Sequence, residues 1–208
     1  RYRVYNLSLC AVLPGPHEPS NESLQHFLRP FVDDLLRLYL SGVKINTPNH
    51  PEGRLVRVAL VALICDHPAL CKIGGFADQA SARWPCTQCQ IRRADIPGFA
   101  SAACRPRSGE LHKRRAARHY TLPPDKQDDY TRKYGVRWSE FNRLPYFNPI
   151  TMCVIDPMHS LLLGKRLRPN FLAGGDNINI VQVYRVACGT RFGSLAVKLI
   201  KSSSRTSA

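Results

Sequence analysis

Large apolar side chains near the start of the chain recur at three- and four-residue spacing and predict an amphipathic helix. They are Leu24, Phe27, Leu28, Phe31, Leu35 and Leu38. Ser20 or Asn21 can cap this helix, and Gly42 can end it. Pro30 lies within the pattern and is expected to kink or split the helix. The stripe therefore predicts a scaffold helix buried on one side.

Two further apolar runs predict strands. Residues 54–65 are rich in Val and Leu and become apolar on both faces, as in the central strand of a covered sheet. Residues 151–155 form a second, shorter run, and residues 46–53 between the helix and the first strand are expected to be a loop. Residues 90–130 show little periodicity and predict irregular chain or short helices. Together the pattern predicts an α/β fold.

Length and composition limit the class of protein. The chain has 208 residues, of which 44% are apolar, so it can bury one sizeable core. No apolar run approaches the ~20 residues of a membrane span, so we expect no membrane partner, and no signal peptide is visible. Because the chain begins with Arg1, we expect it to be an internal piece of a longer protein.

Charge points to a polyanionic partner. Lys and Arg number 30 against 15 acids, which gives a formal net charge of +15. The excess is concentrated in residues 101–170, where 14 cations face six acids, whereas residues 1–100 carry 11 and eight. Nucleic acid is the commonest polyanion, so DNA is the expected partner, and a solvated basic face is the alternative.

Two aspartates stand where the predicted strands end. Asp66 and Asp156 each follow an apolar run, and carboxylates at neighbouring strand ends can bind divalent ions for phosphodiester chemistry. Each also suits a helix N-cap, since Pro68 and Pro157 would lie in a first helical turn. His159 would share a helix face with Asp156 and could orient it, join a metal site or pack as a core histidine. The metal-site and helix-cap interpretations of the two aspartates both stay open, as do the three roles of His159.

Cysteine spacing suggests a second metal. The chain has eight cysteines and no secretory signal, which argues against a disulfide framework. Cys86-x-x-Cys89 is half of a tetrahedral zinc site, and the nearest further donors are Cys104, His112 and His119. Their spacing fits no standard zinc finger, and two buried free cysteines are the alternative.

Basic clusters lie near these cysteines. Several positive charges close together release counterions from a nucleic acid when they bind it. The candidate phosphate contacts are Arg92, Arg93, Lys113, Arg114, Arg115 and Arg118. The Lys113–Arg115 run is also a weak nuclear-import signal.

A series of motifs runs through residues 1–164. The motifs are, in order, Leu13-Pro14-Gly15-Pro16, Phe27-Leu28-Arg29-Pro30, His50-Pro51-Glu52-Gly53, Cys65-Asp66-His67-Pro68-Ala69, Cys86-x-x-Cys89, Gly135-Val136-Arg137-Trp138, Leu144-Pro145-Tyr146 and Asp156-x-Met158-His159. In this order they resemble the transposase domain of fungal CACTA (En/Spm-type) DNA transposons.

The resemblance implies a partial RNase H-like (DDE/D) core with added helices and a basic, zinc-held insertion at about residues 86–130. It implies Asp66 as the first acid and Asp156 as the second, with His159 as its companion. Two Mg²⁺ or Mn²⁺ ions on such acids would activate water, and later a 3′-hydroxyl, for attack on DNA. The implied partners are the DNA of transposon ends and other copies of the chain, and the implied location is the nucleus.

The resemblance ends after Gly164. Residues 165–208 match nothing in the family and are expected to be largely irregular or disordered, although residues 178–184 favour a strand by propensity. Asp176 is their only acid and lies in a turn-like setting. We therefore expect a fragment of a cut-and-paste transposase that lacks its third acid and is inactive alone. The alternatives are a non-enzymatic DNA-binding remnant and a pseudogene product that does not fold.

Overall fold

The structure is a computed structural model that describes residues 7–13, 17–77, 83–98, 105–156, 180–188 and 194–201. These residues form a mixed α/β arrangement, as predicted. The helices are α1 (Asn21–Leu40), α2 (His67–Gly74), α3 (Gly109–Tyr120), α4 (Pro124–Tyr134) and α5 (Pro149–Met152), with 3₁₀ turns η2 (Arg93–Gly98) and η4 (Glu140–Arg143). The strands are β1 (Leu7–Leu13), β2 (Val43–Thr47), β3 (His50–Val56), β4 (Val58–Cys65), β5 (Cys153–Ile155), β6 (Ile180–Cys188) and β7 (Ser194–Lys201).

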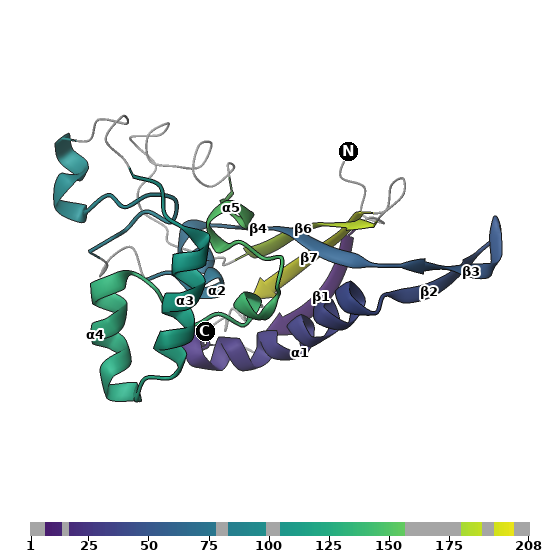
Figure 1. Ribbon diagram of the computed structural model, residues 1–208, viewed down its shortest axis with the longest axis horizontal. Helices are drawn as coiled ribbons and strands as arrows, with labels where there is room; N and C mark the ends of the chain where they lie inside the picture. The colour runs from purple at the N-terminus through teal and green to yellow at the C-terminus, as the bar shows by residue number, and fades with distance from the viewer. Residues whose placement is uncertain are drawn as a thin grey trace, which may run out of the picture.

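The main sheet has five strands in the order β1-β7-β6-β4-β5. β4 and β5 are parallel, as are β1 and β7, whereas β6 runs antiparallel to both β4 and β7. β2 and β3 form a separate antiparallel hairpin that extends away from the rest of the molecule (Figure 1). None of the helices in the described ranges is long and apolar enough to cross a membrane.

Helix α1 confirms the predicted stripe except at Phe27, which is 46% exposed. The Ser20 hydroxyl caps it by accepting a hydrogen bond from the Ser23 amide at 3.1 Å, and Gly42, at φ +74°, follows its end. The helix is continuous through Pro30, so the expected split is wrong. Leu28 and Val32 are buried on either side of Pro30, and their packing holds both halves in one helix.

The predicted first strand is divided in two. Residues 54–56 belong to β3 and residues 58–65 to β4, with Arg57 between them. The loop expected at residues 46–53 is wrong for most of its length, because β2 continues to Thr47 and β3 begins at His50. A two-residue turn of Pro48 and Asn49, residue types that suit tight turns, connects the paired Thr47 and His50.

The C-terminal part differs from the expectation of irregular chain. β6 lies inside the predicted tail and includes most of the residues 178–184 that favoured a strand by propensity. β7 was not expected; its sequence, SLAVKLIK, contains the Val and Ile residues that are typical of strands. Residues 157–179, where Asp156 would cap a helix, lie outside the described residues, as do residues 189–193 and 202–208 of the tail expected to be irregular or disordered.

The core lies between the sheet and its helices. α1 contributes Leu24, Leu28, Val32 and Leu35, and these pack in one cluster with side chains of β4, α2 and the segment around η4, including Leu60, Leu63, Leu70, Ile73, Phe141 and Phe147. The Tyr146 hydroxyl accepts a hydrogen bond from the Leu60 amide at 3.0 Å. This packing fixes the β4 end, where the first candidate acid lies.

Candidate functional site

The two candidate acids lie side by side at the carboxyl ends of neighbouring strands. Cys65 of β4 pairs with Ile155 of β5 in a parallel register, so the next residues, Asp66 and Asp156, leave the sheet at the same edge. The Asp156 amide donates a hydrogen bond to the Cys65 carbonyl at 2.7 Å, which joins the two ends. Both aspartates are half-buried. The strand register therefore brings together carboxylates that are 90 positions apart in the sequence.

Asp66 is also a helix cap. Its Oδ1 accepts a hydrogen bond from the Ala69 amide at 2.8 Å at the start of α2, with Pro68 in the first turn. The cap interpretation is therefore confirmed for Asp66. It leaves the metal interpretation untouched, because a carboxylate has two oxygens and the cap bond occupies one.

The pKa of the buried Cys65 thiol depends in part on the negative charge of this pair. Burial raises the pKa of Cys65 well above its usual value, and the nearby Cys153, Asp66 and Asp156 raise it further. Cys65 therefore stays a neutral thiol packed beneath the two acids.

Residues 83–90 form the turn that holds the two predicted zinc cysteines. The Cys86 sulfur accepts hydrogen bonds from the Gln88 and Cys89 amides, each at 3.4 Å, and neither cysteine is in a disulfide. Burial raises the pKa of Cys86, and the amide bonds oppose it without cancelling it. The thiol form thus prevails near neutral pH, and a metal would have to displace its proton.

Across the described ranges, no three His, Cys, Asp or Glu side chains lie together so as to hold a metal ion. The aspartate pair and the cysteine pair each supply two donors of the right kind, oxygen for Mg²⁺ or Mn²⁺ and sulfur for Zn²⁺. Both sets fit their metals as parts of a site, and neither is complete within the described residues.

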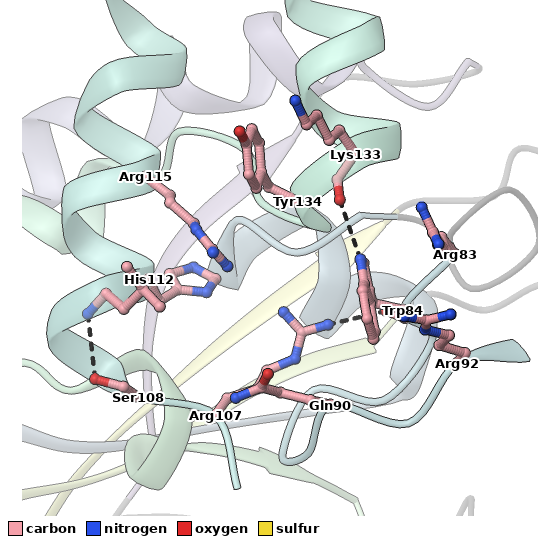
Figure 2. Close-up of a pocket in the computed structure, with 11 residues that line it drawn as sticks. Arg83, Trp84, Gln90, Arg92, Arg107, Ser108, His112, Arg115, Lys133 and Tyr134 are labelled. Carbon is pink, nitrogen blue, oxygen red and sulfur yellow. Dashed lines mark hydrogen bonds between the residues drawn. The ribbon is translucent and has the colours of Figure 1, made fainter. Parts of the chain in front are cut away.

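A basic and aromatic pocket lies beside the cysteine turn (Figure 2). We call it the Trp84 pocket; its cavity volume is about 280 Å³. It is lined by Arg83, Trp84, Gln90, Arg92, Arg107, Ser108, Leu111, His112, Arg115, Lys133 and Tyr134. These come from the cysteine turn, the start of α3 and the end of α4, and none of them is acidic.

Hydrogen bonds to backbone carbonyls fix the middle of this pocket. Arg107 donates from Nε to the Cys89 carbonyl at 3.2 Å and from Nη2 to the Trp84 carbonyl at 3.0 Å. The Trp84 indole nitrogen donates to the Lys133 carbonyl at 3.0 Å, which ties the turn to α4. Gly135, at φ +69°, follows α4, and a Cβ there would lie 3.2 Å from both Arg107 Nη2 and Trp84 Cβ.

The cations of the pocket interact with its rings and with one another. The Arg92 guanidinium carbon lies 5.5 Å from the Trp84 ring centroid, and that of Arg115 lies 4.8 Å from the Tyr134 ring centroid. Burial lowers the pKa of Arg107; the nearby Cys86 and Cys89 oppose this shift, and the positive charge of Arg115 adds to it. The pocket is thus positively charged and partly desolvated before any ligand enters.

His112 is the neutral member of this lining. It is 3% exposed, its ring lies 4.6 Å from that of Phe76, and neither ring nitrogen makes a well-formed hydrogen bond within the described part of the chain. Burial, followed by the positive charge of Arg107, lowers its pKa to about 3. His112 is therefore uncharged at neutral pH.

The structure separates the predicted phosphate contacts into groups. Arg92 and Arg115 line the Trp84 pocket, and Arg114 and Arg118 are exposed on α3. Lys113 is engaged elsewhere, since its amine donates to the Leu144 and Phe147 carbonyls at 2.9 and 3.1 Å.

The other predicted residues lie apart from the pocket or outside the described residues. Arg93 begins η2, where its amide bonds the Arg83 carbonyl at 3.0 Å. His119 is buried against a second cavity, on the side of α3 that faces Trp138. Cys104 and His159 lie outside the described residues.

Sequence reasoning missed Arg83, Trp84, Arg107, Lys133 and Tyr134. They stand up to 51 positions apart in the sequence, and only the tertiary contacts of α3, α4 and the cysteine turn assemble them. The one local signal is Trp84, an aromatic residue flanked by arginine two positions before Cys86.

Part of the chain matches a known protein family. Residues 2–99 match the family model of the transposase family tnp2. This supports a transposase family and a transposase-related function for the chain. The match spans β1 to η2 and includes Asp66, Trp84, Cys86 and Cys89, whereas Asp156 lies beyond it. A transposase family also suggests DNA as a partner. No curated protein and no solved structure matches the chain.

Proposed function

We propose that the chain is part of a cut-and-paste DNA transposase of the CACTA type. Its core would be RNase H-like, with Asp66 and Asp156 as the first two acids. The observation that carries this proposal is the parallel register of β4 and β5, which brings both aspartates to one sheet edge. The family match over residues 2–99, which contains Asp66, supports it.

Asp66 and Asp156 would hold Mg²⁺ or Mn²⁺ through their carboxylate oxygens. When bound, two such ions supply an activated water or 3′-hydroxyl and stabilise the attacked phosphate. The residues of the chain itself position the acids: the Ala69 amide orients Asp66 and the Cys65 carbonyl anchors the Asp156 backbone. With two acids, the site binds ions weakly, and we propose that the 208 residues alone do not cleave DNA.

Iron-directed cleavage of the protein backbone tests the metal site without relying on DNA cleavage. Fe²⁺ with ascorbate and peroxide cuts a chain near the ion it replaces, so we expect fragments that end near residues 66 and 156. Asp66→Asn and Asp156→Asn should abolish both cuts. Asn also caps helices, so Asp66→Asn keeps the start of α2. Asp34→Asn, at an exposed ion pair of α1, is the matched control.

Unchanged cutting in both aspartate variants would overturn the proposed metal site. A nicking assay on supercoiled DNA with Mn²⁺ adds the second test. Nicking that disappears in Asp66→Asn and Asp156→Asn would show that the site is complete in these 208 residues and would contradict the proposed inactivity.

The alternative function is DNA binding without catalysis, and the Trp84 pocket favours it because its cations face no acid among the lining residues. Affinity for DNA that falls steeply with salt and is the same with and without added Mg²⁺ is the result expected for that function. Loss of affinity when Mg²⁺ is omitted would argue against it.

Three further elements of the proposal rest on the resemblance and on the charge. We propose that the chain works in the nucleus, that it associates with further copies of itself at transposon ends, and that the Cys86–Cys89 turn binds Zn²⁺ as the base of a structural insertion. Zinc release on adding a thiol reagent, measured with a chromogenic chelator on purified protein, tests the last of these. Zinc content unchanged in Cys86→Ser would contradict it.

A further inference from the structure

We propose that the Trp84 pocket binds a single unpaired nucleotide of a DNA strand, with its phosphate among the arginines and its base against the Trp84 ring. This inference rests on the proposed DNA-related function and names the form of DNA that the basic region recognises.

Unpaired positive charge is the first argument. Five cations line the cavity: Arg83, Arg92, Arg107, Arg115 and Lys133. None of the five forms an ion pair with a carboxylate in the described part of the chain. Two of them, Arg107 and Arg115, approach one another inside the cavity (Figure 2). A phosphate between them would neutralise this repulsion, and guanidinium groups bind phosphate oxygens through paired N–H donors.

Preorganisation is the second argument. Arg107 is held by two carbonyls, and Trp84 by the Lys133 carbonyl, so neither side chain has to be ordered when a ligand enters. The Arg107 Nη1 group makes no hydrogen bond in the described part of the chain and remains available to a ligand. Fixed donors in a partly desolvated pocket bind a phosphate more strongly than mobile surface lysines do.

The aromatic rings are the third argument. Trp84 and Tyr134 line the same cavity, and both are half-buried, with part of each ring open. Rings beside cations are the combination with which proteins bind single strands, since every base has a face that stacks on an aromatic ring. The guanidinium carbons of Arg83 and Arg92 lie over the Trp84 ring, 5.7 and 5.5 Å from its centroid. An entering base would have to displace one of these side chains from the ring, and the displaced cation would stay close to the phosphate.

Size selects the form of DNA. A cavity of about 280 Å³ is at the lower end of small-ligand sites and suits one nucleotide. A double helix cannot enter it, so the nucleotide has to leave the stack, as in enzymes that take a base out of the duplex. Single strands, extrahelical nucleotides and opened strand ends offer such a nucleotide at little cost.

Tryptophan fluorescence tests the inference directly. The chain has two tryptophans, Trp84 and Trp138, so in Trp138→Phe the indole emission comes from Trp84 alone. We expect a duplex with one extrahelical thymidine to quench Trp84, and the same duplex with an abasic site at that position to quench it much less. In Trp84→Phe, the emission of Trp138 should not change. Equal quenching by the abasic duplex would overturn the inference.

Binding measured by fluorescence anisotropy, in buffer without Mg²⁺ or Mn²⁺, gives the energetic test. Trp84→Ala should weaken binding of the extrahelical duplex at least fivefold, as expected for loss of one stacked base, and should leave the fully paired duplex within twofold. Trp84→Phe should retain most of the affinity, and an unchanged melting temperature in either variant shows that the fold is intact. Arg107→Gln should weaken binding of the same duplex. Arg132→Gln, which changes an exposed α4 residue paired with Asp129, is the control for the loss of one positive charge.

Other ligands are outcomes of the same titration. Thymidine monophosphate or inorganic phosphate that competes as well as the extrahelical duplex would assign the pocket to a free anion and overturn the inference. So would tighter binding of the RNA strand of the same sequence. Because no Mg²⁺ or Mn²⁺ is added, failure of the aspartate metal site leaves these measurements unaffected. Loss of Trp84 quenching alone would leave the proposed transposase function standing.

Discussion

Arg29 and Arg143 surround a carboxylate, whereas Arg107 and Arg115 surround a cavity. The first pair meets Glu140, which is 2% exposed and accepts hydrogen bonds from Arg29 at 3.3 Å and Arg143 at 3.0 Å. The Trp138 indole donates to the same carboxylate at 3.1 Å. In the Trp84 pocket Arg107 bonds to two carbonyls, Arg115 lies over the Tyr134 ring, and the two guanidinium groups face one another.

The Glu140 network connects α1 to η4. Arg143 also pairs with Asp33 of α1, and the Glu140 amide donates to the Gln25 side chain at 2.8 Å. Burial raises the pKa of Glu140, but the hydrogen bonds from Trp138, Arg29 and Arg143 outweigh it and hold the pKa below its usual value. The charges are satisfied within the fold, which is typical of a structural site.

The comparison teaches how to separate structural arginines from ligand-binding ones. An arginine that is neutralised inside the fold contributes to stability, and its removal should leave DNA binding alone. An arginine that is held by carbonyls and meets no carboxylate should contribute little to stability until an anion binds beside it. Four measurements sharpen or break this distinction.

The largest effect is expected at Glu140. Glu140→Ala leaves Arg29 and Arg143 without their shared carboxylate, and we expect the free energy of unfolding to fall by about 3 kcal/mol, moderated by the partial exposure of both arginines. Urea unfolding followed by circular dichroism measures it. Asp34→Ala, at an exposed pair with Arg37, should cost less than about 0.5 kcal/mol and serves as the control. Reduced DNA affinity in folded Glu140→Ala would break the comparison.

The next effect is a pH dependence from His112. In the folded chain its pKa is about 3, whereas an unfolded histidine titrates near pH 6.5. Between these values the unfolded state binds the extra proton, so stability is full above pH 6.5 and falls as the pH decreases toward 3. We expect a loss of about 2 kcal/mol between pH 7 and pH 5.

His112→Gln should flatten this slope, and unfolding curves at pH 7, 6 and 5 measure it. The lowered pKa of His119 acts in the same direction and leaves a residual slope. Glu140 contributes below this window, since its stabilisation is present above about pH 4.3 and lost as the pH falls through its lowered pKa. An equal slope in His112→Gln would contradict the assignment.

A smaller effect is expected at Gly135, which lies against the pocket. Its φ of +69° strains any other residue, so Gly135→Ala should cost about 1 kcal/mol. The new Cβ would also press on Arg107 and Trp84 and should weaken DNA binding severalfold. Gly53→Ala, at φ +83° in the β2–β3 hairpin, introduces similar strain away from the pocket and should leave DNA binding unchanged.

The smallest effect is expected from Arg115→Gln. Removing one phosphate contact should lower the slope of log affinity against log salt by about 0.9 on duplex DNA, or about 0.7 on a single strand. Stability should change little, since this side chain forms no ion pair in the described part of the chain. Binding measured at four salt concentrations gives the slope. A slope equal to that of the parent chain would place Arg115 outside the interface.

Sequence reasoning predicted the α/β class, the helix of residues 21–40 and both aspartates at strand ends, because apolar periodicity and capping are local properties. It failed at residues 46–53, where a two-residue turn converted an expected loop into a hairpin, and at Pro30, where buried neighbours kept the helix whole. It also failed at β7. At Pro30 the packing of the helix outweighed the local signal, whereas at the hairpin and at β7 the residue types agree with the structure and the prediction overlooked them.

The sequence by itself determined which residues carry chemistry: two aspartates after apolar runs, a Cys-x-x-Cys turn and an excess of cations. Only the tertiary structure decided which of them meet. Parallel pairing of β4 with β5 joined Asp66 to Asp156, and the packing of α3 and α4 against the cysteine turn gathered Arg107, Arg115 and Trp84 around one cavity. The physical reason is that charge and residue type are properties of single positions, whereas pairing and desolvation depend on neighbours that the fold brings from elsewhere in the chain.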